Sequence, residues 1–254
     1  MTYCLALRLD QGLVFLSDTR TNAGVDDISI YRKLHVIRPA PDRVFVIQAA
    51  GNLATTQEVL DRIARDLSTH GEGATLATVS HMFEAALEVG RVSQDTVAGH
   101  RDALNASGAT GSATFIFGGQ IAGEPPEIFL VYPEGNYIRA SKTRPFLQIG
   151  EAKYGKFWLE FGAHAGTSLD MATKVALGSM LSTTRANLSV GPPYDLGVYA
   201  TDSLDIDEHR IEADSSYLHE LKQVFNRHLK FALDELPPVQ WGQTPSGSGS
   251  TVNS

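Results

Sequence analysis

The chain has 254 residues, 43% of them hydrophobic, and a formal net charge of -8. Its 21 lysines and arginines are scattered rather than clustered, which argues against nucleic acid as a partner. A single cysteine excludes an internal disulfide framework and is compatible with a reducing compartment, and no segment approaches the ~20 apolar residues of a membrane span. We therefore expect one domain over residues 1–242, a flexible tail or linker at 243–254, no membrane partner and a cytoplasmic location.

Apolar runs at the start of the chain predict two β-hairpins. The first hairpin turns at Asp10, Gln11 and Gly12, and the second turns at residues 40–42. Their four strands are expected at residues 2–9, 13–20, 33–39 and 43–51, with a polar loop at 21–31 between the hairpins. Arg8 and Asp10 interrupt the first apolar run too early for a signal peptide. Regular structure from residue 2 onward suggests that the amino terminus itself has a role.

The spacing of apolar residues then changes from strand-like to helical. Recurrence at every third and fourth residue predicts helices over 53–67 and 76–87. Further strands are expected at 111–120, 127–133, 136–141, 145–150, 194–201 and 209–213. Ser168 is expected to cap a helix that runs towards Asn187. A last helix starts at Ser216, and Pro237 and Pro238 end it. Its apolar stripe comprises Leu218, Leu221, Phe225, Leu229, Ala232 and Leu236.

The order of these elements predicts the fold class. Strands that come in hairpins favour antiparallel sheets rather than a parallel doubly wound sheet. Helices that come between the groups of strands can cover the outer faces of such sheets. We expect an α+β fold in which two antiparallel sheets lie between helix layers.

Thr2 is the first candidate for chemistry. If Met1 is removed, Thr2 carries both a hydroxyl nucleophile and a base, its free α-amine. Such an amine titrates near ~7.7 to 8, so part of it is unprotonated at neutral pH and can accept the hydroxyl proton. A threonine after the start methionine is common, however, so this feature alone indicates little.

Asp18 and Lys33 strengthen the Thr2 hypothesis. A turn at residues 10–12 makes opposite residues sum to about 22 or 23, which places residues 17–20 beside residues 2–6. Asp18 is therefore expected near Thr2, and a carboxylate inside a sheet needs a partner such as Lys33. The alternative is that Asp18 caps a turn and Lys33 is a solvated lysine at a sheet edge.

Gly51 lies between an apolar strand and a helix. A glycine there leaves its backbone N–H unobstructed near a helix amino terminus, where it can donate to an oxyanion. An ordinary strand-to-helix turn is the alternative explanation.

Together these residues carry a resemblance. Thr2, "SDTRTNAG", Lys33 and "AAGNLATTQ", in this order and spacing, resemble the β-type subunits of the proteasome, which are amino-terminal-nucleophile (Ntn) hydrolases. Over residues 2–240, including "GEAKYGK", the chain is most similar to the bacterial Anbu family. The resemblance implies a four-layer αββα sandwich and self-assembly into a homo-oligomeric ring or open spiral. It also implies a nucleophilic Thr2 supported by Asp18 and Lys33, with the Gly51 N–H in the oxyanion hole.

The resemblance further assigns four residues to the neighbourhood of the substrate, namely Thr21, Asn22, Ala49 and Leu53.

Two positions depart from the pattern of proteasomal β subunits. Gly150, Glu151 and Ala152 replace a Gly-Ser-Gly turn whose serine supports the nucleophile, and a glutamate cannot simply replace that hydroxyl. Ser189 matches a supporting serine, but Asn187 or Ala186 takes the place of an aspartate. The Thr2 amine is therefore held differently, and Glu151, Lys153 and Tyr154 are candidates for a substitute network or a subunit contact.

Other patterns favour no competing chemistry. "GEAKYGKF" has the spacing of a phosphate loop, but Phe157 stands where a magnesium ligand is needed. The eight histidines show no metal-ligand spacing, so no metal or cofactor is expected. Cys4 is a nucleophile only if cleavage occurs just before it, and a packed strand cysteine is the preferred interpretation.

The leading functional prediction is a self-assembling threonine hydrolase that acts on peptide or related amide bonds. The alternatives are an assembly or binding protein on the same fold, and an amidase for small non-peptide substrates. The sequence neither requires nor excludes an unfoldase partner.

Overall fold

The computed structural model describes residues 1–22, 28–69 and 74–239. The tail expected at 243–254 lies outside these residues, as does the centre of the loop expected at 21–31. In the described part, six α-helices accompany two five-stranded sheets and one two-stranded sheet. Every strand pairing in these sheets is antiparallel, so the predicted combination of helices and antiparallel sheets is confirmed.

The first large sheet contains the amino-terminal hairpin. Its spatial order is β10-β1-β2-β11-β12. The bounds are β1 Tyr3–Leu9, β2 Gly12–Asp18, β10 Phe146–Gly150, β11 Tyr194–Ala200 and β12 Ile206–Ile211. Nearly every residue of β1 and β2 is buried, which explains why both strands are continuous apolar runs without alternation.

The register of this hairpin differs slightly from the prediction. Cys4 lies opposite Ser17, so opposite residues sum to 21 rather than to 22 or 23. The physical reason is a tighter turn. Gly12 already pairs with Leu9, which leaves two residues rather than three in the connection. Asp18 is consequently aligned with Tyr3, one or two positions closer to the chain start than the wider turn would place it.

The second large sheet has the order β5-β6-β7-β8-β9. Its bounds are β5 Leu34–Ala40, β6 Arg43–Gly51, β7 Ala113–Ile121, β8 Glu127–Val131 and β9 Tyr137–Arg139. All of these strands were predicted within a few residues. Between the two hairpins, however, the expected loop contains a two-stranded sheet of β3 (Arg20–Asn22) and β4 (Ile28–Ile30). Pairing satisfies the backbone groups of these short segments, which local polarity alone did not reveal.

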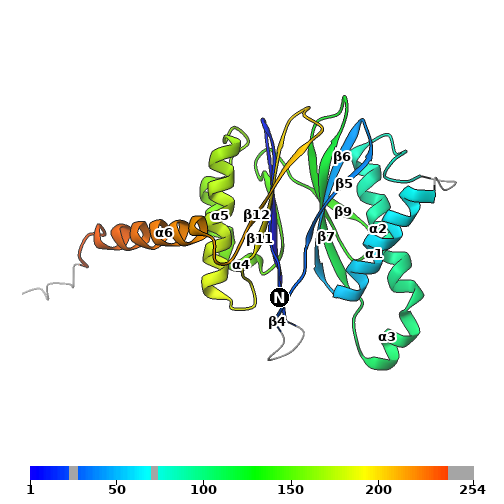
Figure 1. The fold of residues 1–254 in the computed structure, drawn as a ribbon, viewed down its shortest axis with the longest axis horizontal. Coiled ribbons are helices and arrows are strands. Elements are labelled where there is room, and N and C mark those ends of the chain that lie inside the picture. The colour runs from blue at the N-terminus through cyan, green and yellow to red at the C-terminus, as the bar shows by residue number, and fades with distance from the viewer. Residues whose placement is uncertain (23–27, 70–73, 240–254) are drawn as a thin grey trace, which may run out of the picture.

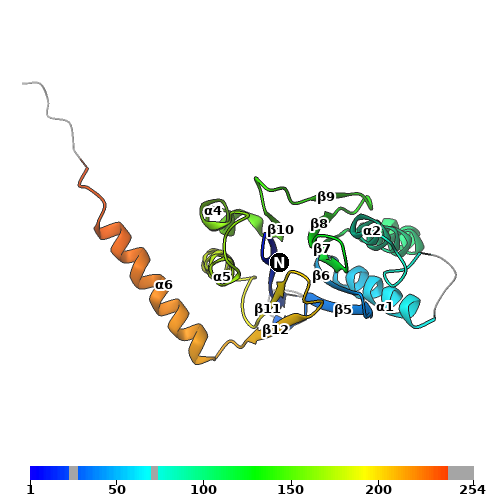
Figure 2. The same cartoon turned by 90° about the horizontal axis from the view of Figure 1, so that it is seen from above.

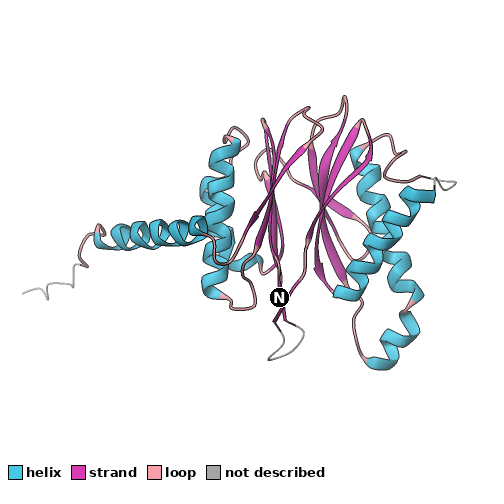
Figure 3. Cartoon of the chain, in the orientation of Figure 1, coloured by secondary structure: helices cyan, strands magenta, loops and turns pink. Residues whose placement is uncertain are grey.

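The helices lie outside the sheets. Their bounds are α1 Leu53–Thr69, α2 Met82–Gly99, α3 Arg101–Ser107, α4 Ala152–Gly162, α5 Leu169–Ala186 and α6 Ser216–Asp234. The two large sheets face each other, with α1 and α2 beyond one and α4 and α5 beyond the other (Figures 1 and 3). α6 extends away from the rest of the molecule (Figure 2).

Buried apolar side chains form three clusters that match this arrangement. One cluster packs β1, β2 and β11 against α4 and α5, and a second packs β6 and β7 against α1 and α2. The third lies between the sheets and contains Phe15, Val46 and Ile116. Both faces of each large sheet are therefore covered, which holds the ends of β1 and β2 in fixed positions.

One helix prediction needs correction, and two helices were not predicted. The helix expected from residue 76 begins at Met82, because Thr75 O accepts from Thr78 N and Val79 N in a turn. α3 has no buried residue and thus no apolar periodicity to find. α4 was missed because Gly155 and Gly162 interrupt its helix-forming sequence.

The predicted stripe of α6 is largely unburied. Only Leu218 at its start is fully buried, whereas Leu229 and Leu236 are exposed. The first half of the stripe joins the core, since Leu221 and Phe225 pack against the cluster that contains Leu218, but the second half does not. The cap of α5 follows the prediction, since Ser168 Oγ accepts from Met171 N at 3.3 Å.

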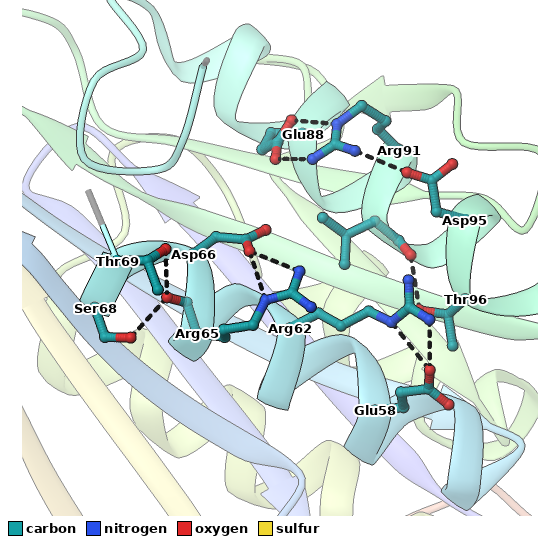
Figure 4. A network of polar contacts seen from close by, with 11 residues as sticks. Glu58, Arg62, Arg65, Asp66, Ser68, Thr69, Glu88, Arg91, Asp95 and Thr96 are labelled. Carbon is teal, nitrogen blue, oxygen red and sulfur yellow. Dashed lines mark hydrogen bonds and ion pairs between the residues drawn. The ribbon is translucent and has the colours of Figure 1, made fainter. Parts of the chain in front are cut away.

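Charged side chains cover α1 and α2 (Figure 4). Arg62 pairs with Glu58 at 2.7 Å, and Arg91 pairs with Glu88 at 2.5 Å and with Asp95 at 2.7 Å. Exposed helix pairs of this kind contribute only about 0.3–0.5 kcal/mol each, so they adjust helix stability and leave the fold to the apolar clusters. None of the helices in the described ranges is long and apolar enough to cross a membrane.

Candidate active site

Thr2 lies immediately before β1 and borders a cavity of about 250 Å³. The cavity wall combines segments that are far apart in the sequence. It includes Thr2, Thr21, Lys33, Ala49, Gly51 and Leu53. These segments meet because β1, β3 and the end of β6 reach the same end of the facing sheets.

The Asp18 carboxylate binds the backbone at the start of β1. One carboxylate oxygen, Oδ1, accepts from the backbone N–H of Tyr3 at 2.9 Å. The other, Oδ2, accepts from the backbone N–H of Gly191 at 3.3 Å. The Asp18 side chain is completely buried, as expected for the last residue of β2 between packed layers. These bonds fix the carboxylate beside the peptide that follows Thr2.

Lys33 supplies the charge that a buried carboxylate needs. Its Nζ lies 2.7 Å from Asp18 Oδ1 and also donates to the backbone oxygen of Arg20 at 2.6 Å. The lysine side chain is itself only 7% exposed. The predicted contact between Asp18 and Lys33 is therefore confirmed, and the alternative of a solvated edge lysine is wrong.

Burial and the neighbouring donors have opposing effects on the pKa of the Asp18 carboxyl. Burial raises the pKa of Asp18 above its ordinary value, and the Lys33 ammonium and the backbone N–H donors only partly oppose this. An ion pair of this kind is costly to break because either partner alone would be a buried charge. The pair thus gives the floor of the cavity a fixed geometry and places a positive charge beside Thr2.

Gly51 forms part of the wall of the cavity that Thr2 borders. Its φ is +118°, and a Cβ there would lie 2.4 Å from the backbone oxygen of Ser112. Only glycine fits this close approach of two strands. The predicted turn between β6 and α1 therefore has a steric requirement that a general strand-to-helix connection does not have.

The other predicted residues have different positions. Thr21, Ala49 and Leu53 line the same cavity as Thr2. Asn22 belongs to β3 by its backbone, and its side chain lies outside the described part. Ser189 is in the loop between α5 and β11, where its backbone N–H donates to Asn187 Oδ1 at 2.9 Å.

The departures noted in the sequence meet on the other side of Thr2. The backbone N–H of Glu151 donates to the oxygen of Thr2 at 2.7 Å. Asn187 Nδ2 donates to Glu151 Oε2 at 2.8 Å. Lys153 and Tyr154 belong to a separate contact, in which the ammonium lies 6.0 Å from the centre of the tyrosine ring.

Two glycines near Thr2 were not identified from the sequence. Gly150 has φ +79°, and a Cβ there would lie 1.9 Å from the oxygen of Thr2. Gly191 donates its N–H to Asp18. Gly150 was noted only as part of a departure from a serine-containing turn, and the contact of Gly191 crosses 173 positions of sequence. A glycine at the end of a predicted strand was the one available indication for Gly150.

Cys4 is packed rather than reactive. Its side chain is buried, and Sγ lies 3.9 Å from the oxygen of Ala49. Burial raises the pKa of the thiol far above its ordinary value. The preferred interpretation of a packed strand cysteine is therefore confirmed.

Comparisons with solved structures place the chain in a family. It is 45% identical to Anbu from Hyphomicrobium sp. strain MC1, with a TM-score of 0.85 and coverage of 94% of this chain and 100% of that chain. It is 39% identical to Anbu (ancestral beta-subunit) from Yersinia bercovieri, with a TM-score of 0.88 and coverage of 95% and 100%. A Pseudomonas aeruginosa chain, described as a helical assembly of the Anbu complex, is 41% identical with a TM-score of 0.88 and coverage of 94% and 98%.

These similarities define a relative of proteasome β subunits. The chain belongs to the Anbu family. Comparisons with protein-family models and with curated proteins gave no match.

Proposed function

We propose that the chain is a self-assembling amino-terminal threonine hydrolase for peptide or related amide bonds. The observation that carries the proposal is the position of Thr2 at the cavity, beside the buried pair of Asp18 and Lys33. Met1 is 62% exposed, which is consistent with its removal by an aminopeptidase. Removal frees an α-amine on the residue that also carries the hydroxyl.

In the proposed reaction Thr2 Oγ attacks the substrate carbonyl carbon. The α-amine takes the hydroxyl proton and delivers it to the leaving amine as the amide C–N bond breaks. Water then attacks the acyl-enzyme ester while the α-amine accepts one of its protons. The ester C–O bond breaks, the amine delivers this proton to Thr2 Oγ, and the acid product leaves. The positive charge of Lys33 favours the alkoxide, and Asp18 keeps Lys33 in place.

The remaining roles follow from positions around the cavity. The Gly51 N–H is the proposed donor to the oxyanion that forms during attack. Thr21, Asn22, Ala49 and Leu53 are the proposed substrate contacts. Ser189 is the proposed support of the site through its loop, whose residues Asn187 and Gly191 bond to Glu151 and Asp18.

The proposed architecture is a four-layer Ntn-type sandwich in one domain over residues 1–242. The proposed location of the protein is the cytoplasm. The facing sheets with helices outside them support this architecture. Exposed apolar side chains support association with further copies. Phe157 and Phe161 on α4 are 68% and 73% exposed, and Phe231 on the projecting α6 is 59% exposed. The Pseudomonas aeruginosa relative is described as a helical assembly.

A second candidate is an assembly protein without efficient hydrolysis. The observation that favours it is Glu151, whose carboxylate stands where a supporting hydroxyl was expected. An amidase for small acylated amines is the third candidate. It would use the same residues with a different substrate preference.

The deciding experiment is intact mass spectrometry before and after treatment with an electrophile that captures amino-terminal threonines. We expect loss of Met1 and one adduct on Thr2, located by sequencing the labelled peptide. The variant Thr2→Ala should lose turnover by at least about 10³-fold while its urea unfolding curve is unchanged. Peptides and small acylated amines are then compared as substrates.

The opposite results are equally informative. Retention of Met1, or an adduct that persists in Thr2→Ala, would remove Thr2 from the mechanism. A labelled Thr2 with no turnover of either substrate class would favour the assembly protein.

A further inference from the structure

The backbone of residue 2 is held from two sides. Asp18 accepts from the N–H of Tyr3 on one side, and the N–H of Glu151 donates to the oxygen of Thr2 on the other. Gly150 allows the second contact, because any Cβ at that position would collide with the Thr2 oxygen. Thr2 is therefore fixed between two carboxylate residues.

Glu151 has a fixed side chain as well as a fixed backbone. Asn187 Nδ2 donates to Glu151 Oε2, and Asn187 Oδ1 in turn accepts from the N–H of Ser189. The backbone N–H of Asn187 donates to the oxygen of Thr183, so the asparagine is anchored to the end of α5. This chain of bonds uses one carboxylate oxygen of Glu151 and leaves Oε1 without a hydrogen bond among the described residues.

The two carboxylates differ in charge balance. Asp18 is paired with Lys33 at 2.7 Å, whereas Glu151 has no ion-pair partner in the described part of the chain. Other charged or titratable side chains around the cavity and its floor are Asp18, Arg20, Tyr31, Arg32, Lys33 and His35. Arg20 donates to the oxygen of Leu188, and Arg32 lies beside Asp195 and Glu208. A cation for Glu151 is thus missing until Met1 is removed.

Removal of Met1 creates a cation on Thr2, the residue whose oxygen the Glu151 backbone contacts. Standard bond lengths keep the nitrogen of a residue within about 4 Å of its own carbonyl oxygen. The Thr2 oxygen accepts from the Glu151 N–H at 2.7 Å. The new α-amine therefore lies within about 7 Å of that backbone nitrogen, a distance that a glutamate side chain can span.

We propose that Glu151 is a positioning residue that binds the freed α-amino group of Thr2 and keeps it protonated to a higher pH than a free amine. This inference rests on the proposed function, because it assumes removal of Met1. A nearby carboxylate favours the charged form of an amine, while Lys33 opposes this effect. Since the unprotonated amine is the base, Glu151 orients the base and shifts its activity towards alkaline pH. Asn187 determines where the carboxylate lies.

The test measures the amine directly. Protein with Met1 removed, verified by intact mass, is acetylated with trace acetic anhydride from pH 5 to 10, and the amino-terminal peptide is quantified. Glu151→Gln keeps the size and hydrogen bonding of the side chain but removes its charge. We expect its titration midpoint to fall by about 0.5–1 pH unit, a ~3–10-fold change in the proton dissociation constant.

Two further variants make the result specific. Glu160→Gln changes an exposed carboxylate on α4, the helix that follows Glu151, and should leave the midpoint unchanged. Asn187→Ala keeps Glu151 but frees its carboxylate, and should give a smaller fall; it replaces Glu151→Gln if that variant does not fold. Coincident curves for wild type and Glu151→Gln, a rise in the midpoint, or retention of Met1 would overturn the inference.

Labelling of the amine does not depend on hydrolysis. A shifted midpoint without turnover would refute the proposed hydrolase while Glu151 keeps its assigned contact. Turnover without a shift of the midpoint would support the proposed hydrolase and refute the role of Glu151.

Discussion

The two ends of the β1–β2 hairpin each combine a cavity with a carboxylate, but they satisfy the carboxylate differently. At the Thr2 end, Asp18 has a lysine at 2.7 Å and two backbone donors. At the turn end, Glu127 has Arg8 at 3.3 Å, and its Oε2 has no hydrogen-bond partner in the described part of the chain. The cavity at the turn end is the larger, about 500 Å³ against about 250 Å³.

The difference shows that the proposed site is not at the larger of these two cavities. The smaller cavity has a residue with a latent nucleophile and base, and it lies over a fully bonded ion pair. The larger cavity is bordered by Arg8, Asp10 and Lys142, and the side chain held most firmly in its wall is the neutral Gln120, which donates to Asp202 Oδ1 at 2.6 Å. Preorganised charge, rather than volume, distinguishes the Thr2 end.

The largest expected contrast comes from removing the cation at each end. Lys33→Met leaves Asp18 as a buried, unpaired charge and should lower the free energy of unfolding by about 3–5 kcal/mol. Arg8→Met removes a longer contact whose partners are 23% and 12% exposed, and should cost about 1–2 kcal/mol. Urea unfolding with unchanged m-values measures both.

The double variant Asp18→Asn/Lys33→Met provides the control for packing. Because it leaves no buried charge, it should recover much of the stability lost in Lys33→Met. Equal losses for the Lys33 and Arg8 variants would show that the two ends are not energetically different.

A second contrast uses one glycine at each end. Gly150 and Gly123 have φ values of +79° and +85°, so alanine is strained at both, by about 1 kcal/mol. A Cβ at Gly123 meets nothing within 4 Å, but at Gly150 it would lie 1.9 Å from the Thr2 oxygen. Gly150→Ala should therefore lose about 2–4 kcal/mol and Gly123→Ala only about 1 kcal/mol.

Labelling of Thr2 sharpens this contrast. Gly150→Ala should also slow capture of Thr2 by the electrophile, because the collision displaces its backbone, whereas Gly123→Ala should leave the rate unchanged. Similar labelling rates in both variants would mean that the contact of Gly150 with Thr2 does not position the nucleophile.

Most of the fold could be predicted because its elements are locally encoded. The apolar runs of β1 and β2, the helical spacing of α1 and the cap at Ser168 are properties of short segments. α3 was missed because it buries nothing, and α4 because glycines lower its helical tendency. The exposed half of α6 shows the converse, a helical stripe with no partner among the described residues.

The candidate site was predictable where it depends on a hairpin. Asp18 approaches the chain start because β1 and β2 are joined by a short turn, and this holds although the register was predicted one or two residues too wide. The contacts of Glu151 with Thr2 and Asn187 depend on the pairing of β10 with β1 and on the end of α5. No local pattern encodes those long-range distances, so the substitute network stayed an open question in the sequence.

The smallest expected effect is a pH dependence at the turn end. Burial raises the pKa of Glu127, and Arg8 and Arg139 only partly oppose it. The folded state therefore binds this proton more readily than the unfolded state, whose carboxyl titrates near ~4.3. Stability from this group is present at low pH and is lost as pH rises from that value through the higher folded pKa.

Glu127→Gln removes this titration and should gain stability relative to wild type as pH rises from 4 to 7, by urea unfolding at each pH. Glu160→Gln, an exposed change, should show a flat difference over the same range. A flat difference for Glu127→Gln would mean that Arg8 and Arg139 offset the effect of burial on the Glu127 carboxylate completely. In that case the pairing of the buried carboxylate would no longer distinguish the two ends of the hairpin. They would differ only in that one of them holds Thr2.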